Sequence, residues 1–163
     1  MKHIKTKYIL PAAICLLSFQ ACKQQADYKA VRKEIINIHD TIMNEDGKLM
    51  ADESMLKSMI APASLAALKK ANNGMDTAAE KLKATTLIHR LDSVSNAMSD
   101  WMGKFNPDVQ GKNAQQATDY FGIEKVKISQ LDSSYKAALK TTGDYLRKFH
   151  LKAADSSAMK MKM

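Results

Sequence analysis

Turn-forming residues are scarce in this chain, whose 163 residues include only six glycines and three prolines. Strand-like alternation of β-branched and polar residues is also absent. These two absences leave helix as the expected secondary structure throughout. The length suits a single domain with a modest hydrophobic core. We therefore expect an all-α protein.

The chain also lacks an apolar run that could cross a bilayer. Its first apolar stretch, Tyr8–Phe19, is too short for that and follows three lysines. A basic start, a short apolar stretch and then a small residue, Ala21, form the layout of a cleaved secretory signal. We expect residues 1–21 to be removed on export.

The end of this segment reads Leu16-Leu17-Ser18-Phe19-Gln20-Ala21-Cys22. It resembles a bacterial lipobox, in which a signal peptidase cuts before a cysteine that carries diacylglyceryl and N-acyl chains. Ala21 fits that motif, whereas Phe19 and Gln20 are looser than its usual leucine and small residue. An ordinary cleaved signal with an incidental cysteine is the alternative. The lipobox interpretation makes Cys22 the lipidation site, and two or more acyl chains give firm membrane attachment.

Cysteine is nearly absent too, with Cys15 and Cys22 the only two. On the lipobox interpretation Cys15 would leave with the signal and Cys22 would be acylated, so no thiol would remain for a disulfide, a zinc finger or a nucleophile. Removing residues 1–21 also takes away three lysines and no acidic residue, which lowers the formal charge from +8 to +5. That charge is spread among acids with only three arginines, which disfavours nucleic-acid binding.

Apolar residues recur every three or four positions in the first long segment after a polar tether at residues 22–26. This helix should end at Ala61, because the residue before a proline is disfavoured in the helical region. Gly47 lies between Glu45 and Asp52, two acids on the apolar stripe, and predicts a bend near the middle. The apolar positions are Val31, Ile35, Ile38, Ile42, Leu49, Leu56 and Met59.

Turn signals delimit a short helix at residues 64–71, closed by Asn72-Asn73-Gly74. Asp76 or Thr77 can cap the next helix, with Glu80 placed for a capping box on Thr77. The apolar series of this second long helix has alternating spacings of four and three, as in packed bundles. Its members are Leu87, Leu91, Val94, Met98, Trp101 and Phe105.

A loop at residues 106–111 precedes the last long helix, predicted from about Ala114 to Lys152, with Gly122 and Gly143 as weak points. Its apolar seam consists of Ile128, Leu131, Tyr135, Ala138, Thr142, Tyr145 and Phe149. Three long helices and one short helix bury their stripes most simply as an antiparallel bundle over residues 27–152. We expect residues 153–163 to form a frayed tail. Heptad-like spacing does not decide between pairing within and between chains, so the oligomeric state stays open.

Two short motifs resemble a known group of proteins. The segments Ile38-His39-Asp40-Thr41-Ile42-Met43 and Ala97-Met98-Ser99-Asp100-Trp101-Met102, with a long polar helix after them, look like those of small uncharacterised bacterial lipoproteins. Such proteins are sometimes labelled viral A-type inclusion proteins. The resemblance implies a helical lipoprotein of the cell envelope and supplies no catalytic residues.

The same motifs contain candidate metal ligands. His39 and Met43 lie four residues apart on one helix, and Met98 and Met102 form a second pair on another. Imidazole and thioether are the ligands that copper prefers where thiolate is absent. A hairpin of the first two long helices centred near residue 68 would bring His39 near Met98. Methionine is also a common gap-filler of helical cores, and we favour packing over metal binding at these positions.

Other functional hypotheses have less support. The alternating methionines Met159, Met161 and Met163 could hold Cu(I), but a disordered basic tail is the simpler interpretation. Haem ligation is disfavoured because no attachment motif with paired cysteines is present.

Enzyme activity is not expected. The carboxylates of the first long helix scatter around it and place no acid and base across a cleft. These are Glu34, Glu45, Asp46, Asp52 and Glu53. No phosphate loop, nucleophile elbow or metalloprotease motif occurs.

The sequence therefore predicts a lipid-anchored protein of the outer membrane that faces the periplasm. Lys23 stands where an aspartate would indicate retention at the inner membrane. Its helical bundle would act as an interaction or structural module with an envelope protein as partner and without a cofactor. Copper binding by the bundle is the alternative.

Overall fold

The computed structural model describes residues 27–151. Its elements in chain order are α1 (Tyr28–Met59), α2 (Pro62–Ala71), α3 (Thr77–Lys104) and α4 (Ala114–Lys148). No strand occurs within residues 27–151, so the predicted all-α class is confirmed. The predicted signal, the lipobox-like segment with Cys22 and the predicted tail at 153–163 lie outside these residues.

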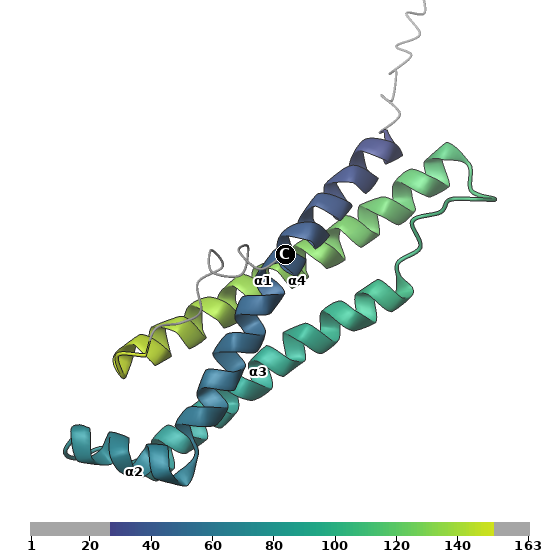
Figure 1. Ribbon diagram of the computed structural model, residues 1–163. Helices are drawn as coiled ribbons and strands as arrows, with labels where there is room; N and C mark the ends of the chain where they lie inside the picture. Colours follow the sequence, from purple (N-terminus) through teal and green to yellow (C-terminus); the bar gives the residue numbers. More distant parts are fainter. Residues whose placement is uncertain (1–26, 152–163) are drawn as a thin grey trace, which may run out of the picture.

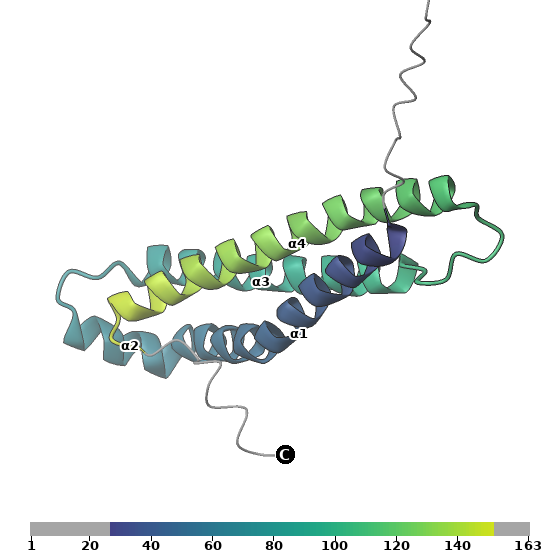
Figure 2. The same cartoon turned by 90° about the horizontal axis from the view of Figure 1, so that it is seen from above.

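The three long helices lie side by side as an elongated up-down-up bundle, with α2 at one end and the 105–113 loop at the other (Figures 1 and 2). Consecutive long helices are antiparallel, so α1 and α4 run in the same direction. The Tyr28 and Phe121 rings stack at 6.2 Å, and the Tyr135 hydroxyl donates to Asp46 at 3.2 Å further along. Both α1 and α4 therefore start at the loop end. None of the four described helices is long and apolar enough to cross a membrane.

The core is built from three series of side chains that repeat every seven residues. All members of these series, apart from Phe149, are at most 2% exposed. Because the three series have the same repeat, antiparallel packing stacks them as successive layers along the bundle. They are Ile35, Ile42, Leu49 and Leu56 in α1, then Ala84, Leu91 and Met98 in α3, and Phe121, Ile128, Tyr135, Thr142 and Phe149 in α4.

The bend predicted at Gly47 leaves α1 a continuous helix from Tyr28 to Met59. Both views show the two halves of α1 running in different directions (Figures 1 and 2). Asp52, predicted on the apolar stripe, is fully buried. Pro62 ends α1 as predicted and becomes the first residue of α2, where its missing N–H needs no partner.

The N-terminus of α3 differs in part from its prediction. Asp76 is the cap, and its Oδ1 accepts from the backbone N–H groups of Ala78 and Ala79 at 2.9 and 3.1 Å. Thr77 is the first helical residue, so the capping box predicted for Thr77 with Glu80 is wrong. The Glu80 carboxylate turns toward α4 instead. A full capping box occurs at α4, between Asn113 and Gln116.

The end of α4 was predicted too late, at Lys152. The helix ends at Lys148, and His150 takes a left-handed conformation with φ 58°. The Leu151 N–H donates to the Leu146 carbonyl at 3.1 Å, and the His150 N–H donates to the Arg147 carbonyl at 3.0 Å. This is a Schellman motif. It folds Leu151 back onto the core, where Leu151 is partly buried.

Replacing His150 by glycine should stabilise the protein by roughly 0.5–1 kcal/mol, because a left-handed conformation is unfavourable for a residue with a Cβ atom and is open to glycine. Denaturant unfolding measures the change. The matched control is Ser133→Gly, at an exposed position inside α4, which should destabilise by about 0.5 kcal/mol. A His150→Gly midpoint at or below that of the wild type would contradict the assignment.

Candidate functional site

The two sequence motifs meet between α1 and α3. The Nε2 atom of His39 lies 3.3 Å from the Sδ atom of Met102. The predicted hairpin placed His39 near Met98, about one turn earlier on α3, and the contact falls on Met102 instead. With His39 opposite Met102, α1 and α3 are shifted by about one turn relative to that symmetric hairpin.

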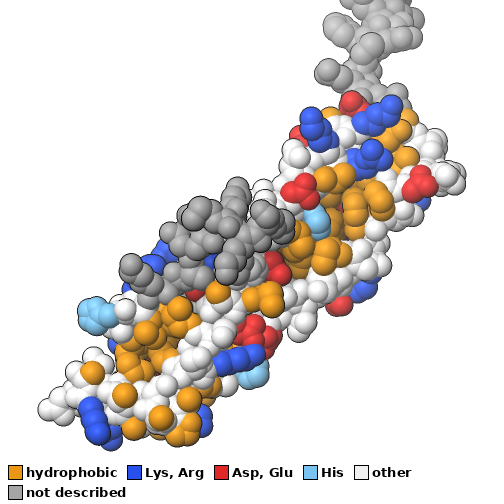
Figure 3. Space-filling model, viewed as in Figure 1, with side chains coloured by type: hydrophobic (Ala, Val, Ile, Leu, Met, Phe, Trp, Pro, Cys, Tyr) orange, Lys and Arg blue, Asp and Glu red, His pale blue; other side chains and the backbone are white. Residues whose placement is uncertain are grey.

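His39 has two further neighbours. Its Nδ1 atom lies 3.0 Å from Oδ1 of Asp40, and its ring centroid lies 6.1 Å from that of Trp101. The His39 side chain is 27% exposed, so solvent reaches it. Figure 3 shows that hydrophobic side chains are exposed among charged ones on the face of the molecule where α1 lies. The His39 imidazole is therefore open to water on one side and contacts a thioether on the other.

The four candidate ligands divide into two groups. Met102 is 41% exposed and contacts the His39 ring, whereas Met98 is 1% exposed and belongs to the core. Met43 is partly buried and packs against the core. Within residues 27–151, no three histidine, cysteine, aspartate or glutamate side chains gather as a possible metal site. A metal site at these motifs would therefore depend on thioether sulfur.

A buried polar pair joins α3 to α4 next to this site. The Nε1–H of Trp101 donates to Oε2 of Glu124 at 2.9 Å, and Lys127 donates to Oε1 at 2.7 Å. Trp101 also stacks on Phe105 at 4.7 Å. Trp101 and Glu124 line an open groove of about 450 Å³ between the two helices. The hydrogen bond between Trp101 and Glu124 fixes the orientation of the indole ring beside His39.

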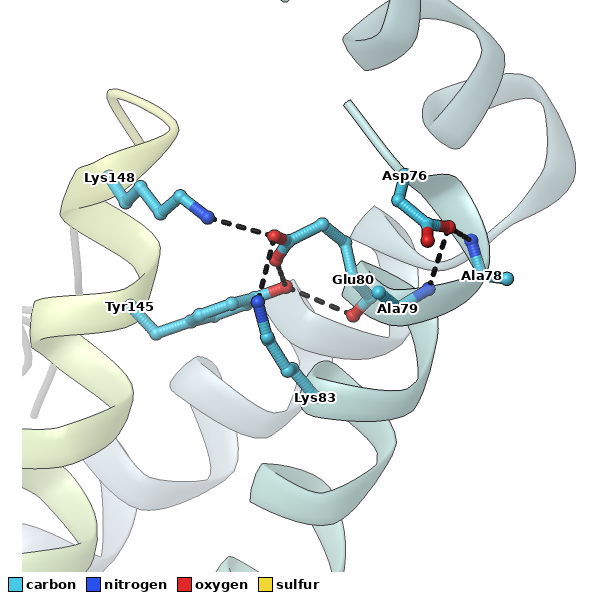
Figure 4. Close-up of polar contacts among 7 residues, drawn as sticks. All are labelled: Asp76, Ala78, Ala79, Glu80, Lys83, Tyr145 and Lys148. Carbon is cyan, nitrogen blue, oxygen red and sulfur yellow. Dashed lines mark hydrogen bonds and ion pairs between the residues drawn. The ribbon is translucent and has the colours of Figure 1, made fainter. Parts of the chain in front are cut away.

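A second buried carboxylate lies at the other end of α3 (Figure 4). Glu80 is 6% exposed, and Tyr145 and Lys148 point at it from α4. The Tyr145 hydroxyl lies 3.0 Å from Oε2 and 3.1 Å from the backbone carbonyl oxygen of Glu80. Lys148 and Lys83 donate to Oε1 at 2.8 and 3.2 Å. Three contacts thus satisfy a carboxylate that is almost removed from water.

These contacts change the acidity of both partners. The hydrogen bond from Lys148 is the main reason that the pKa of Glu80 is lowered, against burial, which acts the other way. Burial, then the hydrogen bond to Glu80, raises the pKa of Tyr145. Between α1 and α4, burial and the charge of Asp46 raise the pKa of Tyr135 to about 12. Glu80 is therefore ionised and both tyrosines are neutral near neutral pH.

Three further carboxylates of α1 pair with separate partners. Asp46 accepts from Tyr135 of α4, and Glu34 pairs with Lys125 of α4. Glu53 pairs with Lys57 one turn along α1. Glu45 is half-buried and Asp52 is fully buried. The carboxylates named in the sequence analysis thus lie at several places along the bundle.

The sequence predicts a capping role for Glu80 and gives no comparable prediction for Glu124. Each glutamate precedes a lysine by three residues, which is the usual pattern of a solvated helix face. Their position in the helical repeat of buried residues is the sequence feature that indicates burial. Glu80 continues the buried positions Ala84 and Leu87, and Glu124 lies between Phe121 and Ile128. A carboxylate in phase with an apolar face needs partners from another helix.

Comparison with protein-family models, with curated proteins and with solved structures found no match for this chain. The resemblance to small bacterial lipoproteins therefore stays a prediction from the two motifs.

Glu80→Gln should lower the free energy of unfolding by about 1 kcal/mol at pH 7, because the amide loses the charge that Lys148 pairs with. The folded-state pKa of Glu80 lies below its usual value of 4.5, so the ionised group stabilises the fold above that pH. This stabilisation is lost as the pH falls through the lowered pKa. The difference between variant and wild type should then shrink on acidification below about pH 4.5.

Denaturant unfolding at pH 7 and at pH 3 checks this. Glu34→Gln, in an exposed pair with Lys125, is the control and should change stability by less than about 0.5 kcal/mol at either pH. A Glu80→Gln difference that is the same at both pH values would show that the charge of Glu80 plays no part.

Proposed function

We propose that this protein is a lipid-anchored module of the bacterial cell envelope that acts through protein–protein contact. The lipobox-like segment before Cys22 supports the anchor. The described bundle begins with the Asp27 cap a few residues later, at the loop end of the molecule. The 35-residue helix α4 is about 50 Å long, so the α2 end would lie about that far from the attachment point.

The outer face of α4 supports a contact role. We use this name for the side of α4 opposite the core, with Ile123 and Val126 followed by Ser129, Ser133 and Ser134. Ile123 and Val126 lie one turn apart and are 59% and 58% exposed. The serines and Val126, together with Lys125 and Gln130, line a shallow groove of about 510 Å³. Small side chains beside an apolar pair let another helix approach closely.

The exposed Ile123–Val126 pair is the observation that carries the contact role. Branched apolar side chains gain little from exposure and have lower helix propensity than lysine or glutamate. The pair also lies near the start of α4, at the same end of the bundle as the start of α1. A partner at this face would therefore be one held near the same membrane.

Cys22→Ser should release the protein from the membrane. The acyl chains supply the attachment, and the mature bundle has no other proposed anchor. The measurement is fractionation of cells into membrane and soluble fractions, together with the mass of the mature N-terminus. Lys23→Ser serves as the control and should stay in the membrane fraction. A Cys22→Ser protein that stays with the membrane would refute the lipid anchor.

A photo-crosslinking amino acid at Ile123 or Val126 should give a discrete adduct in intact cells, because these side chains would lie in the contact. The same group at Ser93, an exposed position on α3, should give none. Gel mobility of the adduct distinguishes a second copy of this chain from a different protein. Absence of adducts at both α4 positions, or equal labelling at Ser93, would count against the outer face of α4 as the contact surface.

A further inference from the structure

The contact between His39 and Met102 places a ring nitrogen against a thioether sulfur, which is an electron-pair donor. In neutral imidazole one ring nitrogen carries a proton and the other a lone pair. If Nδ1 donates to Asp40 at 3.0 Å, the bare Nε2 faces the Met102 sulfur at 3.3 Å. If Nε2 is protonated instead, bare Nδ1 faces a carboxylate oxygen. Neither neutral tautomer satisfies both contacts, whereas a cation on Nε2 does, either the second proton of imidazolium or a bound metal ion.

From this arrangement we propose that His39 and Met102 bind a soft monovalent metal ion, Cu(I), through Nε2 and Sδ. Imidazole with thioether is a ligand set suited to Cu(I), and it offers little to calcium or magnesium, which take oxygen ligands. The site joins α1 to α3.

The separation of the two atoms fits a shared metal. Metal–nitrogen and metal–sulfur bonds of about 2.0 and 2.3 Å, by analogy with zinc, are typical of such ligands. With these lengths, a 3.3 Å separation corresponds to an angle of about 100° at the metal. That angle is close to the tetrahedral value, so the site needs little rearrangement to bind an ion.

Two neighbours extend the site. Asp40 holds Nδ1, which is the arrangement that orients many metal-bound histidines. Met43 lies one turn from His39 on α1, about 6 Å away between Cβ atoms, and its flexible thioether is the candidate third ligand. Met43 is level with Met98 in the antiparallel register that pairs His39 with Met102.

Core packing explains Met98 and leaves Met102 unexplained. Met98 is 1% exposed among apolar side chains, as expected for a gap-filling residue. Met102 is 41% exposed, and its sulfur lies against a ring nitrogen. Leucine would cover the same surface at no loss of helix propensity. The sulfur itself is therefore the feature that needs a role, and metal ligation supplies one.

The test uses the mature lipoprotein purified in detergent. Cu(I) is supplied under a reductant and measured by competition with a chromophoric chelator, and Ag(I) serves as the redox-inert probe. Trp101 is the only tryptophan and lies 6.1 Å from His39 between ring centroids, so its fluorescence reports occupation. The test variants are His39→Gln and Met102→Leu. Matched controls are His89→Gln on α3 and Met50→Leu on α1, both at exposed positions.

We expect one equivalent of Cu(I) or Ag(I) to bind and change the Trp101 fluorescence. Loss of a neighbour that only orients a ligand weakens metal sites 10–100-fold, so loss of either ligand should weaken this one by at least about a hundredfold. His89→Gln, Met50→Leu and replacement of the three tail methionines by leucine should bind as the wild type does.

Three results would overturn the proposal. One is the absence of stoichiometric binding to the wild type. Another is binding that both His39→Gln and Met102→Leu retain, or that only one of them loses, since a two-ligand site needs both. The third is binding lost with Met159, Met161 and Met163, which would place the ion in the tail. Circular dichroism and the unfolding midpoint of each variant separate loss of ligand from loss of fold.

Discussion

Three apolar series with a common seven-residue repeat meet in the core, and their burial fixes how α1, α3 and α4 slide past one another. A slip of one residue on any helix would move Ile42, Leu91 or Tyr135 off the buried face. Each large apolar side chain contributes about 1.5–3 kcal/mol when fully buried. Most helical stability in proteins comes from the packing of an apolar face, so this shared burial also stabilises the helices themselves.

Buried polar contacts at the edges of the core favour the same alignment of the helices. Glu80 reaches Tyr145, Trp101 reaches Glu124, and Tyr135 reaches Asp46, each across a helix–helix boundary. Such contacts add little net stability, because the groups give up water to make them. A shifted register would leave a buried carboxylate or indole N–H without its partner, which costs far more. These contacts therefore penalise alternative alignments that apolar side chains alone would tolerate.

The proposed metal site depends on this register. His39 and Met102 come from helices that connect only through α2 and two turns, and their 3.3 Å contact exists because α1 and α3 are held level. Trp101 is held by Glu124 on one side and lies near His39 on the other. A metal ion bound there would tie α1 to α3 near the end of the bundle where α1 begins. The exposed pair Ile123 and Val126 lies on another face, so contact and metal binding would not compete.

Local sequence determined the helices. The apolar spacing, Pro62 and the Asn72-Asn73-Gly74 turn each affect the backbone only within a few residues of their own positions. It also determined which faces are buried, and it supplies the lipobox prediction for Cys22. Only the tertiary structure decided that Met102 and not Met98 meets His39, because that depends on how far α1 and α3 are offset along the bundle. The roles of Glu80 and the end of α4 were decided in the same way. Tyr145 and Lys148 contact Glu80 from another helix, and the Leu151 side chain becomes partly buried because the chain folds back at His150. Helical periodicity in the sequence predicts neither of these contacts.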